Sequence, residues 1–511
     1  MGRLLTRSRL IGAIVLALYV ALMVFAQLRH EPWRDEIHCW MVGRGSQGLL
    51  DILTGERRYD GHPFLWYWLL HWVSRAWYAP QAMQAFTVLL TACTAFLIVF
   101  RSPFALYERV LLLFSYYFVY EYAVICRSYV VGALLVAAFG ALYDARRVRY
   151  VPLSALLVAM AAVSAYNALI AGSLAIFLFG HHIAVEQPAR RSLIQLAFPK
   201  GALPGLAIFL IGVAFVAVTT APPADAYFDT PISGLLDKNA FQQAARRFLV
   251  GLAPIPPSDT THVWNHAFNE TLPADSIEWI AWAGAALFAA WLAALGRRPF
   301  LALPFFVGSV VMALFQNFKY EGAIRHWGHF SLLLVGCVWL ARKSRPQPPP
   351  WAPSRVLFAA TMLVQVYCGV RVLGADIADP FSGAKATASF IRDNGLADAP
   401  LVGAADHPVS AIAGYLDREM TWAENGETGQ TVVFHNRRKD ASMLDLLEMG
   451  RSVAEKTGKD PVLVTNFPIR MREFRGAQVT PLYDSPTAIV DDETFHVYRM
   501  SWREVGAAKV P

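Results

Sequence analysis

Residues 10–28 read LIGAIVLALYVALMVFAQL, an apolar run long enough to cross the hydrocarbon core of a membrane as one helix. Arg3, Arg7 and Arg9 precede this run. A charged start followed by an apolar run also occurs in signal peptides, but the small residues near Ala26 form a weak cleavage signal. We therefore expect residues 10–28 to form an uncleaved anchor whose N-terminus lies in the cytoplasm.

The composition of the whole chain points to the same class. Of the 511 residues, 56% are hydrophobic and 16% are charged, and the mean hydropathy is +0.38. A soluble globular protein has about 25% charged residues, so a soluble enzyme, a disordered protein and a nucleic-acid-binding protein are disfavoured. The net charge of +7 fits basic residues on cytoplasmic loops. The five cysteines form no disulfide framework and no CxxC metal pair.

Further apolar runs predict a polytopic α-helical membrane protein with about eleven transmembrane helices. These runs cover residues 81–100, 110–126, 129–143, 151–165, 168–184, 203–220, 276–295, 300–316, 329–341 and 356–374. With a cytoplasmic N-terminus, Lys and Arg are about three times denser in the inside loops than in the outside loops, as the positive-inside rule requires.

Segment 62–80 is also apolar, but counting it as a span would reverse the side of every later loop. We expect it to lie in the outer interface as an amphipathic helix. Its tryptophans would then sit at headgroup depth, namely Trp66, Trp68, Trp72 and Trp77.

The resulting layout has two domains. Residues 1–375 form the transmembrane domain, with a first outer loop at 29–80 and a second outer loop at 221–275. Residues 376–511 are less apolar and predict a soluble α/β domain on the outer face, which in a bacterial inner membrane is the periplasmic side. The expected elements of this domain are helices 384–394 and 440–457 and strands 400–404, 431–435, 461–465 and 494–499.

The unusual polar residues gather on the outer side of this layout. They occur in the stretches WRDE (33–36), RYDGHP (58–63), YYFVYEYAVICRSY (116–129) and KYEGAIRHWGH (319–329), and in the turn after the fifth span. Charges at membrane depth normally face a cavity or a partner, so we expect them to ring one cavity at the outer surface. The candidates are Asp35, Glu36, Tyr59, His62, Glu121, Arg127, Asn167, Lys319, Glu321, Arg325 and His326.

Simpler explanations stay open for several of these residues. Asp35 with Glu36 is compatible with a solvated loop, Glu121 with Arg127 is compatible with a plain ion pair, and Tyr166 with Asn167 is compatible with an ordinary turn. His38 with Asp35 and Glu36 is compatible with a metal site, but no H-E-x-x-H or Cys/His pattern supports that alternative.

The side of the membrane restricts the reaction. Nucleotide-activated donors are not available outside the cell membrane, so a transferase there needs a group carried on a lipid phosphate. Such a site needs cations that hold the phosphate and a carboxylate that accepts the proton of an incoming hydroxyl. Lys319, Arg325 and His326 suit the first task, and Asp35 suits the second.

These residues resemble the GT-C superfamily of polytopic glycosyltransferases, in the branch of the protein O-mannosyltransferases and lipid A aminoarabinose transferases. That branch carries an acidic residue in the first outer loop and a His/Lys-Pro-Pro-Leu motif at its end. This chain has Asp35 or Glu36 and then His62-Pro63-Phe64-Leu65, with one proline where the family has two.

The chain also resembles bacterial family-39-like membrane proteins. These share a W-R-D-E start, an R-Y-x-G-H-P-x-L-W-Y segment and a late R-H-x-G motif, here Arg325-His326-Trp327-Gly328. The resemblance is strongest over residues 30–80, extends over 1–375 by topology, and says little about 376–511.

The resemblance implies an inverting sugar transfer from a polyprenyl-phosphate donor to a hydroxyl of a glycan, lipid or protein acceptor. Asp35 is then the general base, with Glu36 as second choice, and His62 positions a substrate near the end of the loop. Lys319, Arg325 and His326 hold the phosphate, Arg127 assists them, and Tyr59, Glu121, Glu321 and Asn167 help to position the substrates. The mannosyl and aminoarabinose branches work without a catalytic metal, so we expect no cofactor, although oligosaccharyl transferases of the same superfamily need a divalent metal.

Two functions from other classes stay open. A transporter or flippase for lipid-linked sugars would carry polar residues on both sides of the bilayer and broken helices near the midplane. A non-catalytic scaffold for envelope-polysaccharide assembly would use its outer domain to bind a partner.

Overall fold

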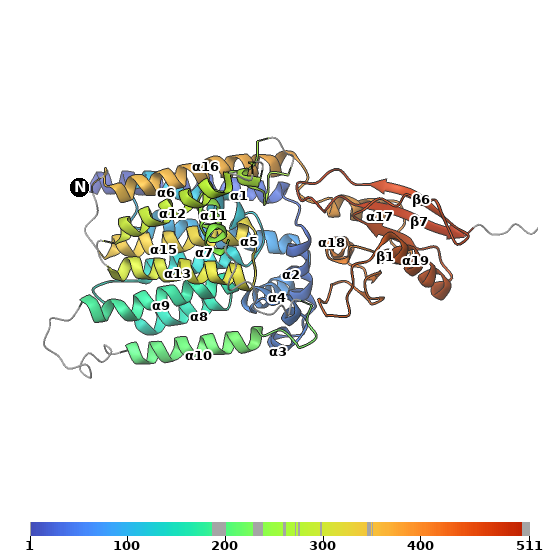
Figure 1. Cartoon of the computed structure of the whole chain (residues 1–511), viewed down its shortest axis with the longest axis horizontal. Helices are drawn as coiled ribbons and strands as arrows, with labels where there is room; N and C mark the ends of the chain where they lie inside the picture. The colour runs from blue at the N-terminus through green and yellow to red at the C-terminus, as the bar shows by residue number, and fades with distance from the viewer. Residues whose placement is uncertain are drawn as a thin grey trace, which may run out of the picture.

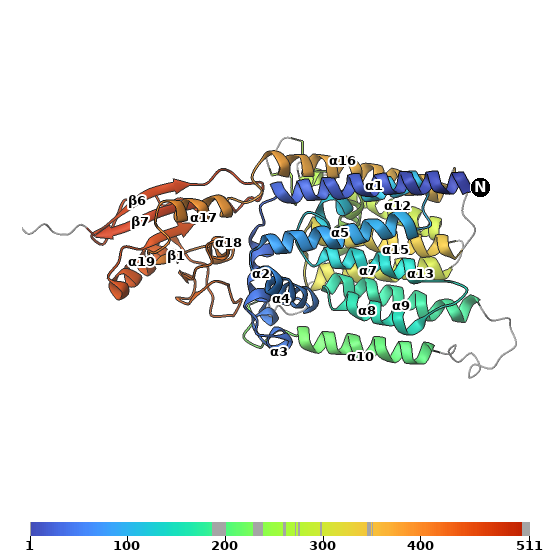
Figure 2. The ribbon, with the colours of Figure 1, turned by 180° about the vertical axis from the view of Figure 1, so that it is seen from behind.

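The chain forms a long helical bundle with a smaller, sheet-containing part at one end (Figures 1 and 2). The computed structural model describes residues 2–185, 201–227, 239–258, 262–270, 272–273, 276–296, 299–344, 349 and 351–502. Figure 1 marks the N-terminus at the end of the bundle opposite the sheet. The fold is therefore that of a mostly helical, membrane-embedded protein that carries a separate C-terminal sheet region.

The bundle consists of roughly parallel and antiparallel helices along the long axis of the molecule. Its longer helices are α1 (Gly2–Arg29), α5 (Gln81–Arg101), α9 (Ala165–Val185), α10 (Ala202–Thr220), α12 (Ser276–Leu295), α13 (Pro299–Phe318) and α16 (Pro353–Ala378). Its shorter helices are α6 (Leu106–Leu113), α7 (Tyr129–Leu142), α8 (Tyr150–Ala161), α11 (Ala240–Leu252) and α15 (His329–Lys343).

Within the described ranges, 5 helices are long and apolar enough to cross a membrane. They are Arg9–Arg29, Gln81–Arg101, Ala202–Thr220, Ser276–Leu295 and Pro353–Ala378. Shorter apolar helices fill the bundle between them, at Tyr129–Leu142, Tyr150–Ala161, Ala165–Gly180 and Ala302–Phe318. Nearly all the apolar runs that the sequence singled out are therefore helical, while the described helices support five candidate spans by length and composition.

The run 110–126 is the exception, because it does not form one continuous helix. Helix α6 ends at Leu113 and a π-helical turn, η2 (Tyr117–Glu121), follows it. The Tyr122 amide donates to the Tyr117 carbonyl at 2.8 Å, which is the wider spacing of a π turn. Its side chains are buried aromatic residues, and the turn directs Glu121 inward rather than continuing the helix.

The first outer loop, 29–80, is compactly folded. It contains α2 (Arg34–Gly45), α3 (Leu49–Thr54), the 3-10 turn η1 (Glu56–Asp60) and α4 (Leu65–Ala76). Helix α2 crosses α4 closely at Gly43, where an added Cβ would lie 2.9 Å from the Leu70 Cβ. The predicted helix in 62–80 is thus present as α4, and it is not among the candidate spans.

The four tryptophans of this segment differ in exposure. Trp66 is 1% exposed and stacks on Phe86 inside the protein, so its ring does not face lipid headgroups. Trp72 and Trp77 are more than half exposed, as an interfacial position requires.

The second outer loop, 221–275, also differs from a simple loop, since the amphipathic helix α11 lies within it and packs against α12.

The C-terminal region contains a seven-stranded mixed sheet with the order β3-β2-β1-β4-β7-β6-β5. The strands are β1 (Leu401–Gly403), β2 (Met420–Trp422), β3 (Thr428–Gly429), β4 (Val462–Thr465), β5 (Glu473–Phe474), β6 (Ala477–Asp484) and β7 (His496–Trp502). Strand β1 is parallel to β2 and β4, and the other neighbours are antiparallel. The helices are α17 (Ala384–Asp393), α18 (Asp406–Leu416) and α19 (Met443–Thr457).

The two faces of this sheet pack against different partners. Alternate strand residues point to opposite sides of the sheet. Val402 and Leu463 therefore join the core under α19, whereas Leu401 and Val462 join a core shared with α17, α18 and the first outer loop.

The expected domain boundary at 375 lies inside α16, which continues to Ala378. The expected strand 431–435 is wrong, because His435 makes only an isolated bridge to Ala226.

Candidate functional site

Asp35 lies at the end of the bundle that faces the C-terminal region, in the first turn of α2. Its Oδ2 is 3.7 Å from Nη2 of Arg127 and 3.7 Å from Nη2 of Arg325. Its Oδ1 is 3.4 Å from Nε2 of His407, which belongs to α18. The fold therefore brings two arginines and one histidine, from three distant parts of the chain, around a single carboxylate.

The charges around Asp35 decide its protonation state. Burial alone would raise the pKa of the carboxyl, but the guanidinium groups of Arg127 and Arg325 outweigh burial and hold the pKa of Asp35 well below its ordinary value. Asp35 is therefore an anion at neutral pH. Asp35 is a weak base as long as the positive charges of Arg127 and Arg325 act on it alone. A second anion bound to these arginines would reduce this effect.

Arg127 connects Asp35 to the end of the first outer loop. Its Nη1 donates to the backbone carbonyl of Asp35 at 2.6 Å, and its Nη2 lies 3.4 Å from Nε2 of His62. The other ring nitrogen of His62 lies 2.7 Å from the Asp60 carbonyl, so Nδ1 carries the proton and Nε2 accepts from Arg127. Burial and the charge of Arg127 lower the pKa of His62, which keeps this imidazole neutral.

Arg325 is held between two indole rings. Its guanidinium carbon lies 5.2 Å from the ring of Trp33 and 5.4 Å from the ring of Trp264, within the range of cation–π attraction. The indole N–H of Trp264 donates to Oε2 of Glu121 at 3.0 Å, and this oxygen also accepts from the Tyr116 hydroxyl at 2.7 Å. Glu121 thus supports the aromatic wall beside Arg325.

Some polar atoms at this site are buried and have no hydrogen-bond partner among the described residues. They are the Nε atoms of Arg127 and Arg325 and the Oε1 atom of Glu121. Buried polar atoms of this kind are costly unless something binds them. Two of these atoms belong to the arginines that face Asp35, which fits a site that receives a polar ligand.

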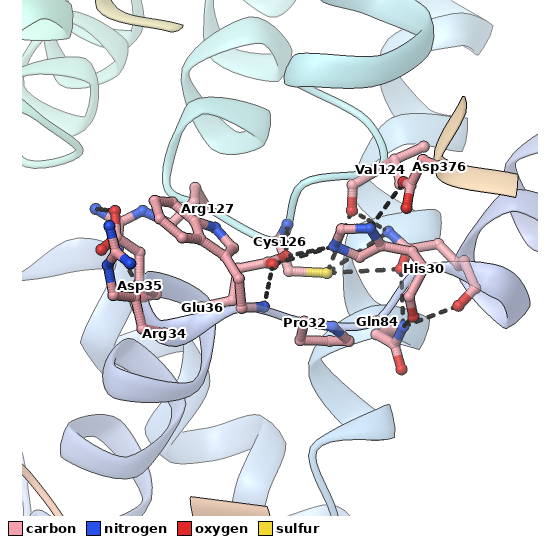
Figure 3. Close-up of polar contacts among 12 residues, drawn as sticks. His30, Pro32, Arg34, Asp35, Glu36, Gln84, Val124, Cys126, Arg127 and Asp376 are labelled. Atoms are coloured by element: carbon pink, nitrogen blue, oxygen red, sulfur yellow. Dashed lines mark hydrogen bonds and ion pairs between the residues drawn. The ribbon is translucent and has the colours of Figure 1, made fainter. Parts of the chain in front are cut away.

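Glu36 follows Asp35 in the sequence but belongs to a separate network (Figure 3). Its Oε2 accepts from the Trp33 amide at 3.0 Å, which caps α2, and lies 3.1 Å from Nε2 of His30. Its Oε1 accepts from the Cys126 amide. The side chain is completely buried and turned away from Asp35, so the structure places Glu36 as a support of the backbone around the site.

The late polar cluster separates into different positions. Arg325 faces Asp35, whereas Nε2 of His326 lies 2.9 Å from the Tyr129 hydroxyl and its Nδ1 accepts from the Ala323 amide at 3.0 Å. Burial and the charge of Arg325 lower the pKa of His326 far below its ordinary value, so the ring offers no positive charge. Lys319 is exposed, and Glu321 pairs with Arg247 at 2.7 Å on the rim.

Two further candidates, Asn167 and Tyr59, have other partners. Asn167 is buried and its Nδ2 lies 3.4 Å from Nε2 of His329, a packing that requires Gly132, where a Cβ would meet Oδ1 of Asn167 at 2.3 Å. Tyr59 donates its hydroxyl to Asp225 at 3.0 Å and so ties the first outer loop to the second. Neither side chain contacts Asp35 in the structure.

Two of the simpler explanations from the sequence, the Glu121–Arg127 ion pair and the His38 metal site, fit this geometry poorly. Glu121 and Arg127 do not pair with each other, because each has the other partners described above. His38 is held by Asp60 at 3.0 Å, and Glu36 is paired with His30 instead. In the part of the chain that the structure describes, no group of three or more His, Cys, Asp or Glu side chains is placed to hold a metal ion.

His407 is one of two residues of this site that the sequence did not predict. It lies in the first turn of a helix that directly follows strand β1. The carboxyl ends of parallel strands often carry functional side chains, so the stretch Asp406-His407-Pro408 after a predicted strand held a usable signal. Trp264 was missed as well, because it lies in an irregular part of the second outer loop.

No protein-family model matches this chain, and no curated protein matches it either.

Proposed function

We propose that the protein is a membrane glycosyltransferase of the GT-C type, which moves a sugar from a polyprenyl-phosphate donor to a hydroxyl acceptor with inversion. One observation carries the proposal: the Asp35 carboxylate lies 3.7 Å from each of two arginines, the buried Arg127 and the partly buried Arg325, at one end of an apolar helical bundle. Arginine binds phosphate through two parallel N–H bonds, and a neighbouring carboxylate suits proton abstraction. The combination fits both halves of a transfer from a lipid phosphate.

The same geometry suggests how the reaction is timed. In the free site, Arg127 and Arg325 suppress the basicity of Asp35. A donor phosphate that binds these arginines neutralises part of their charge, and the pKa of Asp35 then rises toward its ordinary value. The carboxylate therefore becomes an effective base only when the donor is present.

The transfer itself is a single displacement. The acceptor oxygen attacks the anomeric carbon while its proton moves to Asp35, and the bond from that carbon to the phosphate oxygen breaks with its electron pair on the phosphate. The leaving polyprenyl phosphate gains negative charge, which the two arginines stabilise more strongly than in the donor. Attack from the face opposite to the leaving group inverts the anomeric centre.

We assign the remaining roles at the site from the contacts of each residue. The phosphate site is Arg127 with Arg325, whereas Lys319 is exposed and is not needed for this part of the proposal. Neutral His62 fixes Arg127 and positions the substrates, while Glu121 holds the wall behind Arg325. We do not assign a proton-transfer role to Glu36, since its oxygens already accept three hydrogen bonds or ion-pair contacts.

We further propose that all eleven apolar segments lie in a bacterial inner membrane. In this arrangement the N-terminus is cytoplasmic, and the site and the C-terminal region face the periplasm. The placement of the N-terminus and the sheet at opposite ends of the bundle supports this orientation. Buried charges occur at the Asp35 site and in a second cluster, Glu108 with Arg342 and Arg355, in segments expected on the cytoplasmic side. In the second cluster the charges pair with one another, whereas the Asp35 site brings a carboxylate and two arginines together with histidines, which favours an enzyme over a transporter.

The decisive experiment first identifies the donor and then follows its breakdown. Mass spectrometry of lipids that co-purify with the protein should reveal a polyprenyl-phosphate sugar, and incubation with acceptor should release free polyprenyl phosphate. Asp35→Asn should lower the rate of release by at least about 100-fold while still retaining the donor, and Arg325→Ala should retain less donor. Asp393→Asn, on the exposed end of α17, is the matched control and should behave like the parent protein.

Normal release by Asp35→Asn would reject the base assignment. If the parent protein neither holds such a lipid nor releases polyprenyl phosphate, the enzymatic proposal fails. A scaffold would then be favoured if Asp35→Asn also left the cellular phenotype intact.

A further inference from the structure

We infer that His407 is a positioning residue for Asp35, and that the C-terminal region is therefore part of the reaction site. This inference rests on the proposed glycosyl transfer. It assigns to the C-terminal region a direct role at the site, because the site is incomplete without a side chain from α18.

The first support is that the two carboxylate oxygens of Asp35 face different partners. Oδ2 of Asp35 faces Arg127 and Arg325, each at 3.7 Å, whereas Oδ1 faces Nε2 of His407 at 3.4 Å. A carboxylate fixed at only one oxygen can rotate about its terminal bond. Contact at both oxygens restricts that rotation, which keeps the carboxylate aimed at the place where an acceptor hydroxyl arrives.

The imidazole is itself held in place by rings. His407 meets Phe434 edge-on with a centroid distance of 5.1 Å and His38 with a centroid distance of 6.1 Å. His38 is in turn fixed by Asp60 at 3.0 Å. The His407 side chain nevertheless keeps 27% of its surface exposed, so it borders the open part of the site.

The backbone before His407 is also strongly restrained. Ala405 has a φ of 60°, an unusual left-handed conformation for a residue with a Cβ. Oε1 of Glu424 accepts from the amides of Ala405 and Asp406, at 2.7 and 3.1 Å, and Asp406 binds Arg438 through two bonds of 2.6 and 2.7 Å. Strained backbone that is held by so many bonds is typical of functional positions.

The helix of His407 is docked directly onto the helix of Asp35. At Gly414 of α18, an added Cβ would lie 2.3 Å from Cγ2 of the buried Ile37 on α2. The Tyr415 hydroxyl donates to the Pro32 carbonyl at 2.8 Å, just before α2 begins. This close packing fixes the relative positions of the two side chains.

The charge state of His407 suits a positioning role. The charged or titratable groups that face it are Asp35, Arg34 and His38 on α2, and Asp60 on η1. Burial outweighs the attraction of Asp35 and lowers the pKa of His407 to about 3, so the ring is neutral at pH 7. A neutral ring can direct an N–H toward Asp35 without adding a third positive charge, which would weaken the base further.

The test compares two substitutions in the full-length protein. We expect His407→Ala to lower kcat by about 10- to 100-fold, because it frees the carboxylate, with KM for the donor nearly unchanged. His407→Gln keeps a side-chain N–H and should recover most of kcat with the pH profile of the parent protein. His496→Gln, on strand β7 of the same region, is the matched control and should leave kcat unchanged.

The outcomes separate this inference from the proposed function. If the parent protein transfers sugar and both His407 variants are fully active, the inference is wrong and the function stands. If His407→Gln is as slow as His407→Ala and one limb of the pH profile disappears, His407 carries the proton itself and the positioning role is wrong. If the parent protein transfers no sugar, the proposed function fails first.

Discussion

At the scale of single residues, two adjacent carboxylates have opposite surroundings. Asp35 faces two arginines at the edge of a ligand site, and Glu36 is buried against His30 and the backbone of Cys126. The sequence offers both as equal candidates, because their chemistry is the same and they lie one position apart. The direction in which α2 begins separates them, since neighbouring residues of a helix point about 100° apart.

His30 gives a prediction about pH and stability. Although burial lowers its pKa, Asp376 at 2.8 Å and Glu36 at 3.1 Å outweigh burial and raise the pKa of His30 to about 10. The folded state thus keeps this proton over a range in which the unfolded chain, with a pKa near 6.5, loses it. The stabilisation is complete below about pH 6.5 and is lost as pH rises toward 10.

We expect His30→Gln to lower the free energy of unfolding by about 3–5 kcal/mol at pH 6.5, because two buried carboxylates lose their counter-charge. The gap in melting temperature between the parent protein and His30→Gln should shrink steadily up to pH 10. A thermal-unfolding series in detergent measures it, and a gap that stays constant with pH would show that His30 is not charged in the folded state.

At the scale of elements, the packing of α18 on α2 joins the C-terminal region to the site. This contact has no space for a side chain at Gly414. Gly414→Val should push the two helices apart and destabilise the docked arrangement by about 1–3 kcal/mol. Hydrogen exchange should become faster in both helices, while strands β4 and β7 keep their protection.

Gly374→Val in α16 is the control for that experiment, since an added Cβ there meets no atom within 4 Å. It should leave exchange in α2 and α18 unchanged. Equal exchange in the two variants would mean that α18 and α2 are not in close contact in the membrane-embedded protein.

Elements with a clear local sequence pattern could be predicted, and elements without one could not. Helix α19 and strands β1, β4 and β7 show clear patterns, and the sequence places each within a few residues. Helix α18 was missed because nearly all of its residues are buried, which leaves no alternation between apolar and polar faces. The stretch 431–435 looks like a strand, but it has no neighbouring strand with which to pair.

At the scale of the whole molecule, the N-terminus and the sheet lie at opposite ends of the bundle. If the bundle crosses the membrane as proposed, an exposed position after α17 and one between α7 and α8 must lie on opposite sides. Asn394→Cys should react with a membrane-impermeant maleimide in cells with a permeabilised outer membrane. Arg147→Cys should react only after the inner membrane is opened.

The native cysteines do not confuse this measurement. Cys39, Cys126, Cys337 and Cys368 are buried, and Cys93 lies within α5, one of the candidate spans. The parent protein should therefore remain unlabelled. Labelling of both introduced cysteines while only the outer membrane is permeabilised would contradict the proposed orientation.

The sequence by itself determined the class of the protein: apolar runs separated by basic loops require a membrane-embedded helical bundle, because no other arrangement hides them from water. It also marked Asp35, Arg127 and Arg325 as charges in unusual places. Only the tertiary structure decided which of the candidates meet. The side chains that approach Asp35 of α2 within 4 Å come from the turn before α7, the hairpin before α15 and α18. Their proximity arises from the packing of segments that are distant in the chain, and no local sequence pattern encodes that packing.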